Sequence, residues 1–184
     1  THAMFRLALV LIGVLAAGTA RATLIVGADL GELVAGADAI VHGRIVEVRS
    51  VWAEGRRRVD SIVTVATLAR LKGEAGATFS FRTPGGQIGP YRTFMVGAPS
   101  FTEGEEVVLF LRLRGAAAPH VLGLSQGVFR VVADPTGRRL VAPPALVAPE
   151  DAGRIVRGSP ALRPEPIERF TERVRRLAAR SAPR

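Results

Sequence analysis

The stretch from residue 39 to residue 132 constrains the fold most, because it is a series of β-branched, alternating runs separated by turn residues. The expected strands cover residues 40–51, 59–71, 78–82, 93–96 and 105–114, and an interrupted sixth covers 121–124 and 127–132. Long, bent strands favour closure into a barrel, since a closed sheet has no exposed edge. We therefore predict a mainly β fold, with a closed five- or six-stranded barrel of the oligonucleotide/oligosaccharide-binding (OB) type. A β-sandwich is the alternative.

One glycine interrupts the first expected strand. Val46 and Val48 point to one side of that strand, whereas Glu47 and Arg49 point to the other. Gly43 breaks this alternation upstream, which predicts a β-bulge or a sharp bend at that position.

Two helices are expected to flank the strands. The first covers residues 29–36, with Asp29 as N-cap and Gly36 closing the helix in a left-handed turn. The second covers about residues 166–180, where Pro166 suits the first turn. Its apolar residues recur on one side: Ile167, Phe170, Val174 and Leu177.

An apolar leader opens the chain. Arg6 supplies a positive charge, residues 7–17 form an apolar run, and Ala20-Arg21-Ala22 matches an A-x-A cleavage site before Thr23. This pattern predicts a signal peptide over residues 1–22 and a secreted or periplasmic bacterial protein. The chain contains no cysteine, so the exported domain is expected to fold without disulfides.

The positive charge is concentrated in the C-terminal part. The net charge is +9, and residues 154–184 hold nine arginines against three glutamates, whereas residues 23–153 carry a net charge of only +1. We therefore divide the mature chain into a barrel domain (23–142) and a proline- and arginine-rich tail (143–184). A nearly neutral barrel with few aromatic residues argues against nucleic acid as a partner.

The expected C-terminal helix carries a row of arginines on a face that flanks its apolar side: Arg169, Arg173, Arg176 and Arg180. Two interpretations stay open for this row. An amphipathic basic helix can rest on an anionic membrane surface. A solvated basic face is the preferred interpretation, because most charge runs are of that kind.

Several short motifs together resemble a known group of proteins. They are Ala37–Ile45, Leu71-Lys72-Gly73, Thr83–Gly86, Gly104–Phe110 and Gln126–Phe129. With these motifs, residues 30–132 resemble an uncharacterised family of exported bacterial proteins. The first strand also resembles the OB barrels of netrin-like modules and tissue inhibitors of metalloproteinases. This second resemblance implies a barrel, but not the inhibitory mechanism, because those inhibitors chelate the protease metal through an N-terminal cysteine and Thr23 stands at that position here.

The segment from Gly123 to Gly127 matches G-x-S-x-G, the nucleophile elbow of serine hydrolases, with Ser125 as the candidate nucleophile. That motif requires a helix after the serine, and residues 128–132 have the pattern of a strand. Hydrolases also place the histidine after the serine, whereas His42 and His120 both precede Ser125. A glycine-flanked irregularity between two strand halves is the preferred interpretation, and a small serine hydrolase is an alternative.

His42 and His120 are the only histidines after the leader. They could bind a metal with Asp38 or a glutamate, since zinc sites combine histidine and carboxylate ligands. No close ligand spacing such as H-E-x-x-H is present. We therefore expect no metal and no cofactor, and keep the two histidines as weak candidates.

The loop over residues 84–90 is rich in glycine and proline but lacks the Gly-Lys-Ser/Thr ending of a phosphate-binding loop. We interpret it as a hairpin loop at the rim of the barrel, where binding residues commonly lie. The candidate ligand-binding residues are Gly85, Gly86, Gln87, Tyr91 and Arg92.

These observations favour an exported, non-catalytic binding or interaction module whose ligand is an unknown protein or envelope component. A secreted protease-inhibitor-like module is the second hypothesis, on the resemblance of the first strand. Catalysis through Ser125 is the third.

Overall fold

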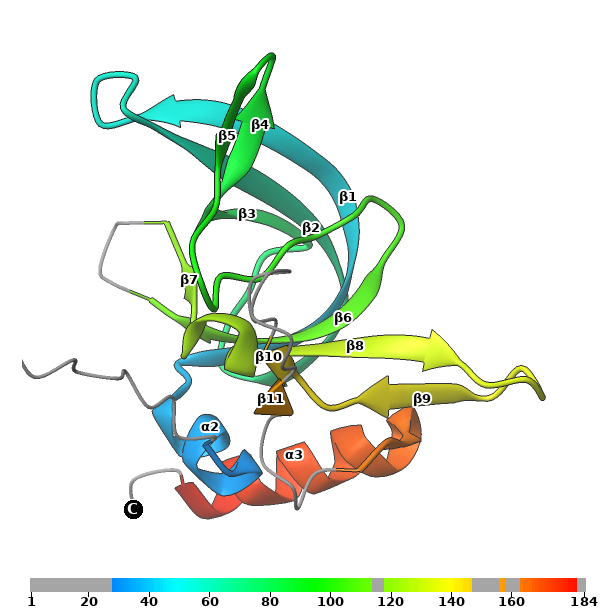
Figure 1. Ribbon diagram of the computed structural model, residues 1–184. Coiled ribbons are helices and arrows are strands. Elements are labelled where there is room, and N and C mark those ends of the chain that lie inside the picture. The colour runs from blue at the N-terminus through cyan, green and yellow to red at the C-terminus, as the bar shows by residue number, and fades with distance from the viewer. Residues whose placement is uncertain (1–27, 114–117, 147–155, 158–162, 182–184) are drawn as a thin grey trace, which may run out of the picture.

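One antiparallel sheet runs through most of the computed structural model, which describes residues 28–113, 118–146, 156–157 and 163–181 (Figure 1). Two α-helices pack beside this sheet, so the prediction of a mainly β fold with two helices is confirmed. The expected signal peptide, residues 1–22, lies outside the described residues. Among the described residues, no helix is long and apolar enough to cross a bilayer.

The large sheet has eight strands, whose hydrogen-bonded order is β12-β9-β8-β6-β1-β2-β3, with β7 also paired to β6. Their bounds are β1 (Ala39–Ala53), β2 (Arg58–Lys72), β3 (Thr78–Pro84), β6 (Glu106–Arg112), β7 (His120–Val121), β8 (Val128–Ala133), β9 (Arg139–Ala142) and β12 (Glu165–Pro166). The remaining strands form two small pairs, β4 (Gly86–Ile88) with β5 (Tyr91–Thr93), and β10 (Ala145–Leu146) with β11 (Val156–Arg157). In the described part of the chain the large sheet therefore ends at β12 and β3, and no hydrogen-bonded closure into a barrel is found.

The strongest bend of the sheet lies in the long β1–β2 pair (Figure 1). Their pairing register shifts at three places, and one shift falls between His42 and Gly43, so the predicted bulge is confirmed. A Cβ atom at position 43 would lie 2.5 Å from Cγ1 of Val65 and 2.9 Å from the carbonyl oxygen of Ala66. Glycine is needed there because the two backbones approach too closely for a side chain.

The sheet is apolar on both faces. On the concave face, strands β1, β2, β3, β6, β7 and β8 contribute to one buried cluster that includes Val63, Phe81 and Leu109. On the other face, the helices α2 (Leu30–Gly36) and α3 (Ile167–Ser181) cover a second cluster around Phe110 and Phe129. Strand β6 contributes to both clusters and is consequently buried on both sides.

Helix α2 begins as predicted but ends differently. The Asp29 side chain accepts a hydrogen bond of 2.8 Å from the Glu32 N–H, and the Glu32 carboxylate accepts one from the Asp29 N–H, which completes a capping box. Gly36 takes no left-handed conformation, and Ala37 follows it in an extended one. The predicted left-handed turn is therefore wrong.

A lysine satisfies the end of α2 instead. The Lys72 ammonium donates hydrogen bonds of 2.7 Å to the carbonyl oxygen of Val34 and 2.6 Å to that of Ala37. Gly73, which follows it, has φ of +64°, and a Cβ there would collide with the carbonyl oxygen of Asp38. The Leu71-Lys72-Gly73 motif thus joins the end of β2 to the start of β1 and to the end of α2.

Helix α3 packs on the sheet through its apolar side. Ile167, Phe170 and Val174 are buried, and the ring of Phe170 lies 5.0 Å from that of Phe129. Strand β12, directly before the helix, pairs with β9. The C-terminal segment is therefore part of the same hydrophobic core as the strands.

Candidate functional site

The β4–β5 hairpin lies across the far ends of β1 and β2 and is fastened to them by hydrogen bonds (Figure 1). The Val59 N–H donates to the Thr93 hydroxyl at 2.8 Å. The Ser61 hydroxyl donates to the Gly85 carbonyl oxygen, also at 2.8 Å. These bonds fix both legs of the hairpin, so the predicted loop over residues 84–90 is a hairpin with a defined position.

Three of the predicted ligand-binding residues build this hairpin. Gly85 has φ of +100°, a value that strongly favours glycine. A Cβ at Gly86 would lie only 3.0 Å from the hydroxyl oxygens of Ser50 and Ser61. The Gln87 N–H donates to the Ser50 hydroxyl at 3.2 Å, and its side-chain amide donates within the hairpin turn. Gly85 and Gly86 therefore have a structural role, while Gln87 stays exposed on β4.

Large apolar side chains are exposed in one short segment that begins on the hairpin. Tyr91 is 62% exposed, Phe94 56%, Val96 54% and Met95 37%. Residues 94–96 had the pattern of a strand, but the structure contains no strand there. A strand in this sheet would bury alternate side chains, whereas Phe94, Met95 and Val96 are all exposed. The sequence pattern therefore did not indicate these three residues as part of a surface site.

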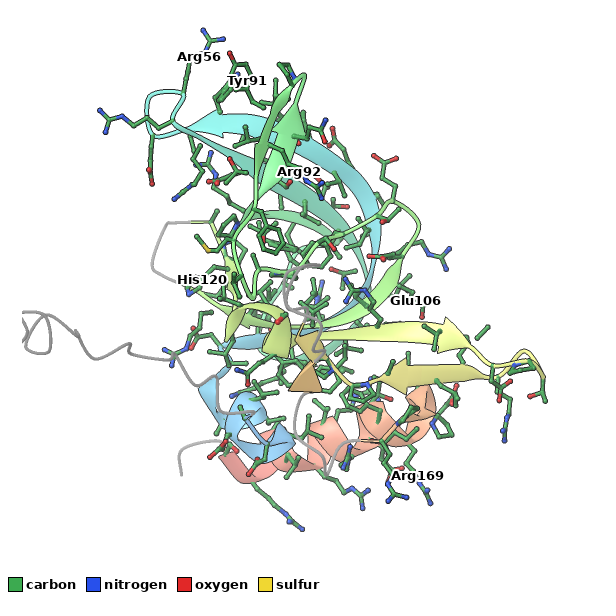
Figure 2. All side chains as sticks on the ribbon, viewed as in Figure 1. Arg56, Tyr91, Arg92, Glu106, His120 and Arg169 are labelled. Carbon is green, nitrogen blue, oxygen red and sulfur yellow. The ribbon has the colours of Figure 1, made fainter. Side chains whose placement is uncertain are left out.

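Aromatic and cationic groups extend the same surface onto the β1–β2 turn. The ring of Trp52 contacts that of Tyr91 edge to face, with centroids 5.3 Å apart, and the Arg56 guanidinium lies 5.5 Å from the Trp52 centroid. Figure 2 shows Arg56 and Tyr91 close together at one end of the molecule, with Arg92 farther along the hairpin. We call the following set the hairpin surface: Trp52, Arg56, Tyr91, Arg92, Phe94, Met95 and Val96.

The surroundings of the hairpin surface are positively charged. Arg56, Arg57 and Arg92 are exposed and form no ion pair within the described part of the chain. The carboxylate of Asp60 is buried and already binds Arg58, with an Nε–Oδ1 distance of 2.8 Å. The arginines at this end therefore outnumber the carboxylates available to neutralise them.

The two candidate metal-binding histidines do not meet. His42 lies on β1 opposite Val108, and His120 lies on β7 opposite Arg112, so they flank β6 on different sides and four residues apart along it. At about 3.4 Å per residue, that offset alone is about 14 Å. Within residues 28–113, 118–146, 156–157 and 163–181, no three histidine, cysteine or carboxylate side chains gather as a metal site would require.

His42 instead forms a buried polar pair. It is 8% exposed, and its Nε2 atom lies 2.6 Å from Oε1 of Glu106 on the neighbouring strand β6. Arg139 of β9 also donates to Glu106 Oε1, and the Arg44 guanidinium lies 3.6 Å from Oε2. The sequence indicated no such cluster, because its members come from three strands that only the sheet pairing brings together.

The G-x-S-x-G segment forms a 3₁₀ turn, η1 (Leu124–Gly127), between β7 and β8. The positive φ values fall on Gly123 and Leu124, which precede Ser125, and a strand follows the turn where a nucleophile elbow has a helix. The Ser125 hydroxyl is buried and hydrogen-bonds to no group in the described part of the chain. The predicted irregularity between two strand halves is thus a short helical turn.

The arginines of α3 do not form one uniform face. Arg173 is paired with Glu165 and lies over the ring of Phe170, at 5.9 Å from its centroid. Arg176 lies 4.0 Å from Glu172, whereas Arg169 and Arg180 are exposed without an ion pair among the described residues. Since the apolar side of the helix is buried on the sheet, only its charged side is available to a membrane surface.

Comparison of the chain with family models, with curated proteins and with solved structures finds no match. Of the five predicted ligand-binding residues, Tyr91 and Arg92 lie on the hairpin surface together with aromatic and apolar neighbours that the sequence had not indicated. The chemistry of this surface is therefore the basis for a functional assignment.

Proposed function

We propose that this chain is an exported, non-catalytic binding module that recognises a protein partner through the hairpin surface. The observation that carries this proposal is the exposure of Tyr91, Phe94, Met95 and Val96 within six consecutive residues. Contiguous apolar exposure of this kind marks interaction sites in folded proteins.

The composition of the hairpin surface favours a protein as the occupant. Aromatic residues, methionine and arginine are enriched at protein–protein interfaces, and tyrosine, tryptophan and arginine dominate their binding energy. Arg56 and Arg92 have no carboxylate partner among the described residues, so the partner is expected to present acidic groups around an apolar centre. The hydrogen bonds that hold the hairpin on β1 and β2 limit the entropy lost on binding.

We also propose that the curled sheet is an OB-like barrel in which packed side chains, without backbone hydrogen bonds, close the gap between strands β3 and β7. Strand β3 lies close to β7 without pairing with it. Phe81 of β3 and Val121 of β7 belong to the same buried cluster, and Phe101 packs on Phe81 with centroids 5.3 Å apart. In this arrangement the hairpin surface lies at the rim, where OB folds place their binding loops.

The partner can be found by site-specific photocrosslinking in the producing cell. A photoreactive phenylalanine replaces Phe94 in one version of the full chain and Val132 in a control version. Val132 is also exposed but lies on β8, away from the hairpin. We expect one crosslinked protein from position 94 and none from position 132. Equal products from both positions, or none from position 94, would overturn the proposal.

The captured protein then allows a quantitative test. Phe94→Asp should weaken its binding more than tenfold, because a charge would enter the apolar centre of the interface. Val132→Asp, the matched change on β8, should leave the affinity unchanged.

N-terminal sequencing of the exported chain tests the leader separately, and the expected first residue is Thr23.

A further inference from the structure

A second candidate site lies far from the hairpin surface, between the sheet and the first turns of α3. It is an open pocket of about 180 Å³. Its lining consists of two apolar residues and five polar ones: Ala69, Ile167, His42, Arg139, Glu168, Thr171 and Arg175. This volume is well above the about 10–15 Å³ that a single water needs, so the pocket can hold a small ligand with some of its hydration.

The inner wall of the pocket is a set of donors held in place by one carboxylate. Glu106 binds His42 and Arg139, with Arg44 at 3.6 Å. A guanidinium has five N–H donors, and the bond from Arg139 to Glu106 leaves others of that residue free to face the pocket. This pairing orients Arg139 without using up its capacity to bind an anion.

The outer wall supplies a second guanidinium. The Arg175 side chain is exposed, lines the pocket and forms neither a hydrogen bond nor an ion pair with any residue that the structure describes. Among the charged residues that line the pocket, two are arginines (Arg139 and Arg175) and one is a carboxylate (Glu168), so cations are in excess on its lining. The Thr171 hydroxyl already donates to the Glu168 carbonyl oxygen, which leaves arginine as the main source of free donors.

We propose that this pocket binds a small oxyanion of the phosphate type, with Arg139 and Arg175 as its principal ligands. Two guanidinium groups that line one pocket from different elements can bind the oxygens of a tetrahedral anion. Arg139 comes from β9 and Arg175 from α3, so a bound anion would also bridge the helix to the sheet. The site is independent of the hairpin surface and of the function proposed for it.

The test is a titration of the full mature protein with inorganic phosphate at constant ionic strength. Binding is monitored through the NMR chemical shifts of the backbone amides. The variant Arg175→Gln removes the outer guanidinium. The matched control is Arg169→Gln, which removes the same charge from an exposed position on the same helix that does not line the pocket. Circular dichroism of both variants shows whether the fold is retained.

We expect saturable shifts at the backbone amides of residues 42, 139 and 171 in the wild-type protein and in Arg169→Gln. In Arg175→Gln the dissociation constant should rise at least tenfold. Equal weakening in both variants would mean diffuse attraction to a basic helix and would overturn the proposal. Absence of saturable binding to the wild-type protein would overturn it as well.

A second arm distinguishes a free phosphate from a lipid headgroup. Vesicles of phosphatidylcholine with phosphatidic acid are sedimented with the same three proteins. Binding that depends on Arg175 and is displaced by inorganic phosphate would assign the pocket to a headgroup. If the vesicles do not retain the protein while free phosphate binds, the oxyanion is a soluble one.

Discussion

At the scale of single residues, the roles of several polar side chains become clear only from long-range contacts. His42 looked like a lone imidazole in the sequence, yet in the structure it contacts a carboxylate 64 positions away. Gly43, by contrast, could be assigned to a bulge from its neighbours alone, because it interrupts a local alternation. The local pattern thus predicted the backbone geometry at Gly43, whereas the polar cluster around Glu106, which is assembled across strands, left no signal in the sequence.

The Glu106 carboxyl gives a titration prediction. Burial raises its pKa, but the hydrogen bond with His42 and the charge and hydrogen bond of Arg139 outweigh burial and hold the pKa below its usual value of 4.5. A lowered pKa in the folded state stabilises the protein above the unfolded-state pKa. That stability is lost as the pH falls through the lower, folded-state value.

NMR titration of the Glu106 carboxyl carbon measures this effect. We expect a midpoint below 4.5 in the wild-type protein and an upward shift in His42→Gln, which loses the imidazole. Arg44→Gln is the control, because Arg44 lies 3.6 Å away, is exposed and contributes little to the lowering of the pKa. A midpoint that is the same in His42→Gln and in wild type would contradict this account.

At the scale of elements, the sequence predicted the long strands and both helices but not where several of them end. Strands β1 and β2 and helix α3 carry long apolar periodicities, so their existence could be predicted. The end of α2 could not, because it depends on Lys72, which is 36 residues after the last residue of the helix. The two-residue strands β10, β11 and β12 are too short to show any period and exist only through pairing.

Lys72 therefore gives a test of how α2 ends. Replacing it with methionine approximately keeps the length of the side chain. It leaves two partly buried carbonyl oxygens, those of Val34 and Ala37, without their hydrogen-bond donor. We expect a loss of about 1.5–3 kcal/mol in the free energy of unfolding, measured with urea, since hydrogen bonds to charged groups are of that size. Arg70→Met, which removes a positive charge from an exposed position on the same strand, should change it by no more than about 0.5 kcal/mol.

At the scale of the whole molecule, the sequence left open whether the C-terminal helix packs on the strands, and in the structure it does. Charge and proline content set residues 143–184 apart in the sequence, but α3 covers one face of the sheet and β12 extends its edge. Most of the arginines of α3 are exposed, namely Arg169, Arg175, Arg176 and Arg180. The apolar residues Ile167, Phe170 and Val174, which do the packing, are too few to alter the overall composition.

The role of α3 in the core can be measured. Phe170→Ala removes a ring that is 2% exposed and packs on Phe129. The expected loss is about 3–5 kcal/mol in the free energy of unfolding, typical of a large-to-small change in a core. Arg169→Ala, next to it in sequence and exposed, should have an effect within about 0.5 kcal/mol. A loss below about 1 kcal/mol for Phe170→Ala would mean that the helix is only loosely attached.

Burial of β6 on both faces has a consequence for the newly made chain. The run Val107-Val108-Leu109-Phe110-Leu111 combines high β-propensity with no charge and no proline, a composition that self-associates when left uncovered. Two helices cover its outer side, and one of them, α3, follows it by more than fifty positions in the order of synthesis. Until α3 emerges, only α2 can cover that side, and the growing protein depends on chaperones or on rapid completion to avoid aggregation.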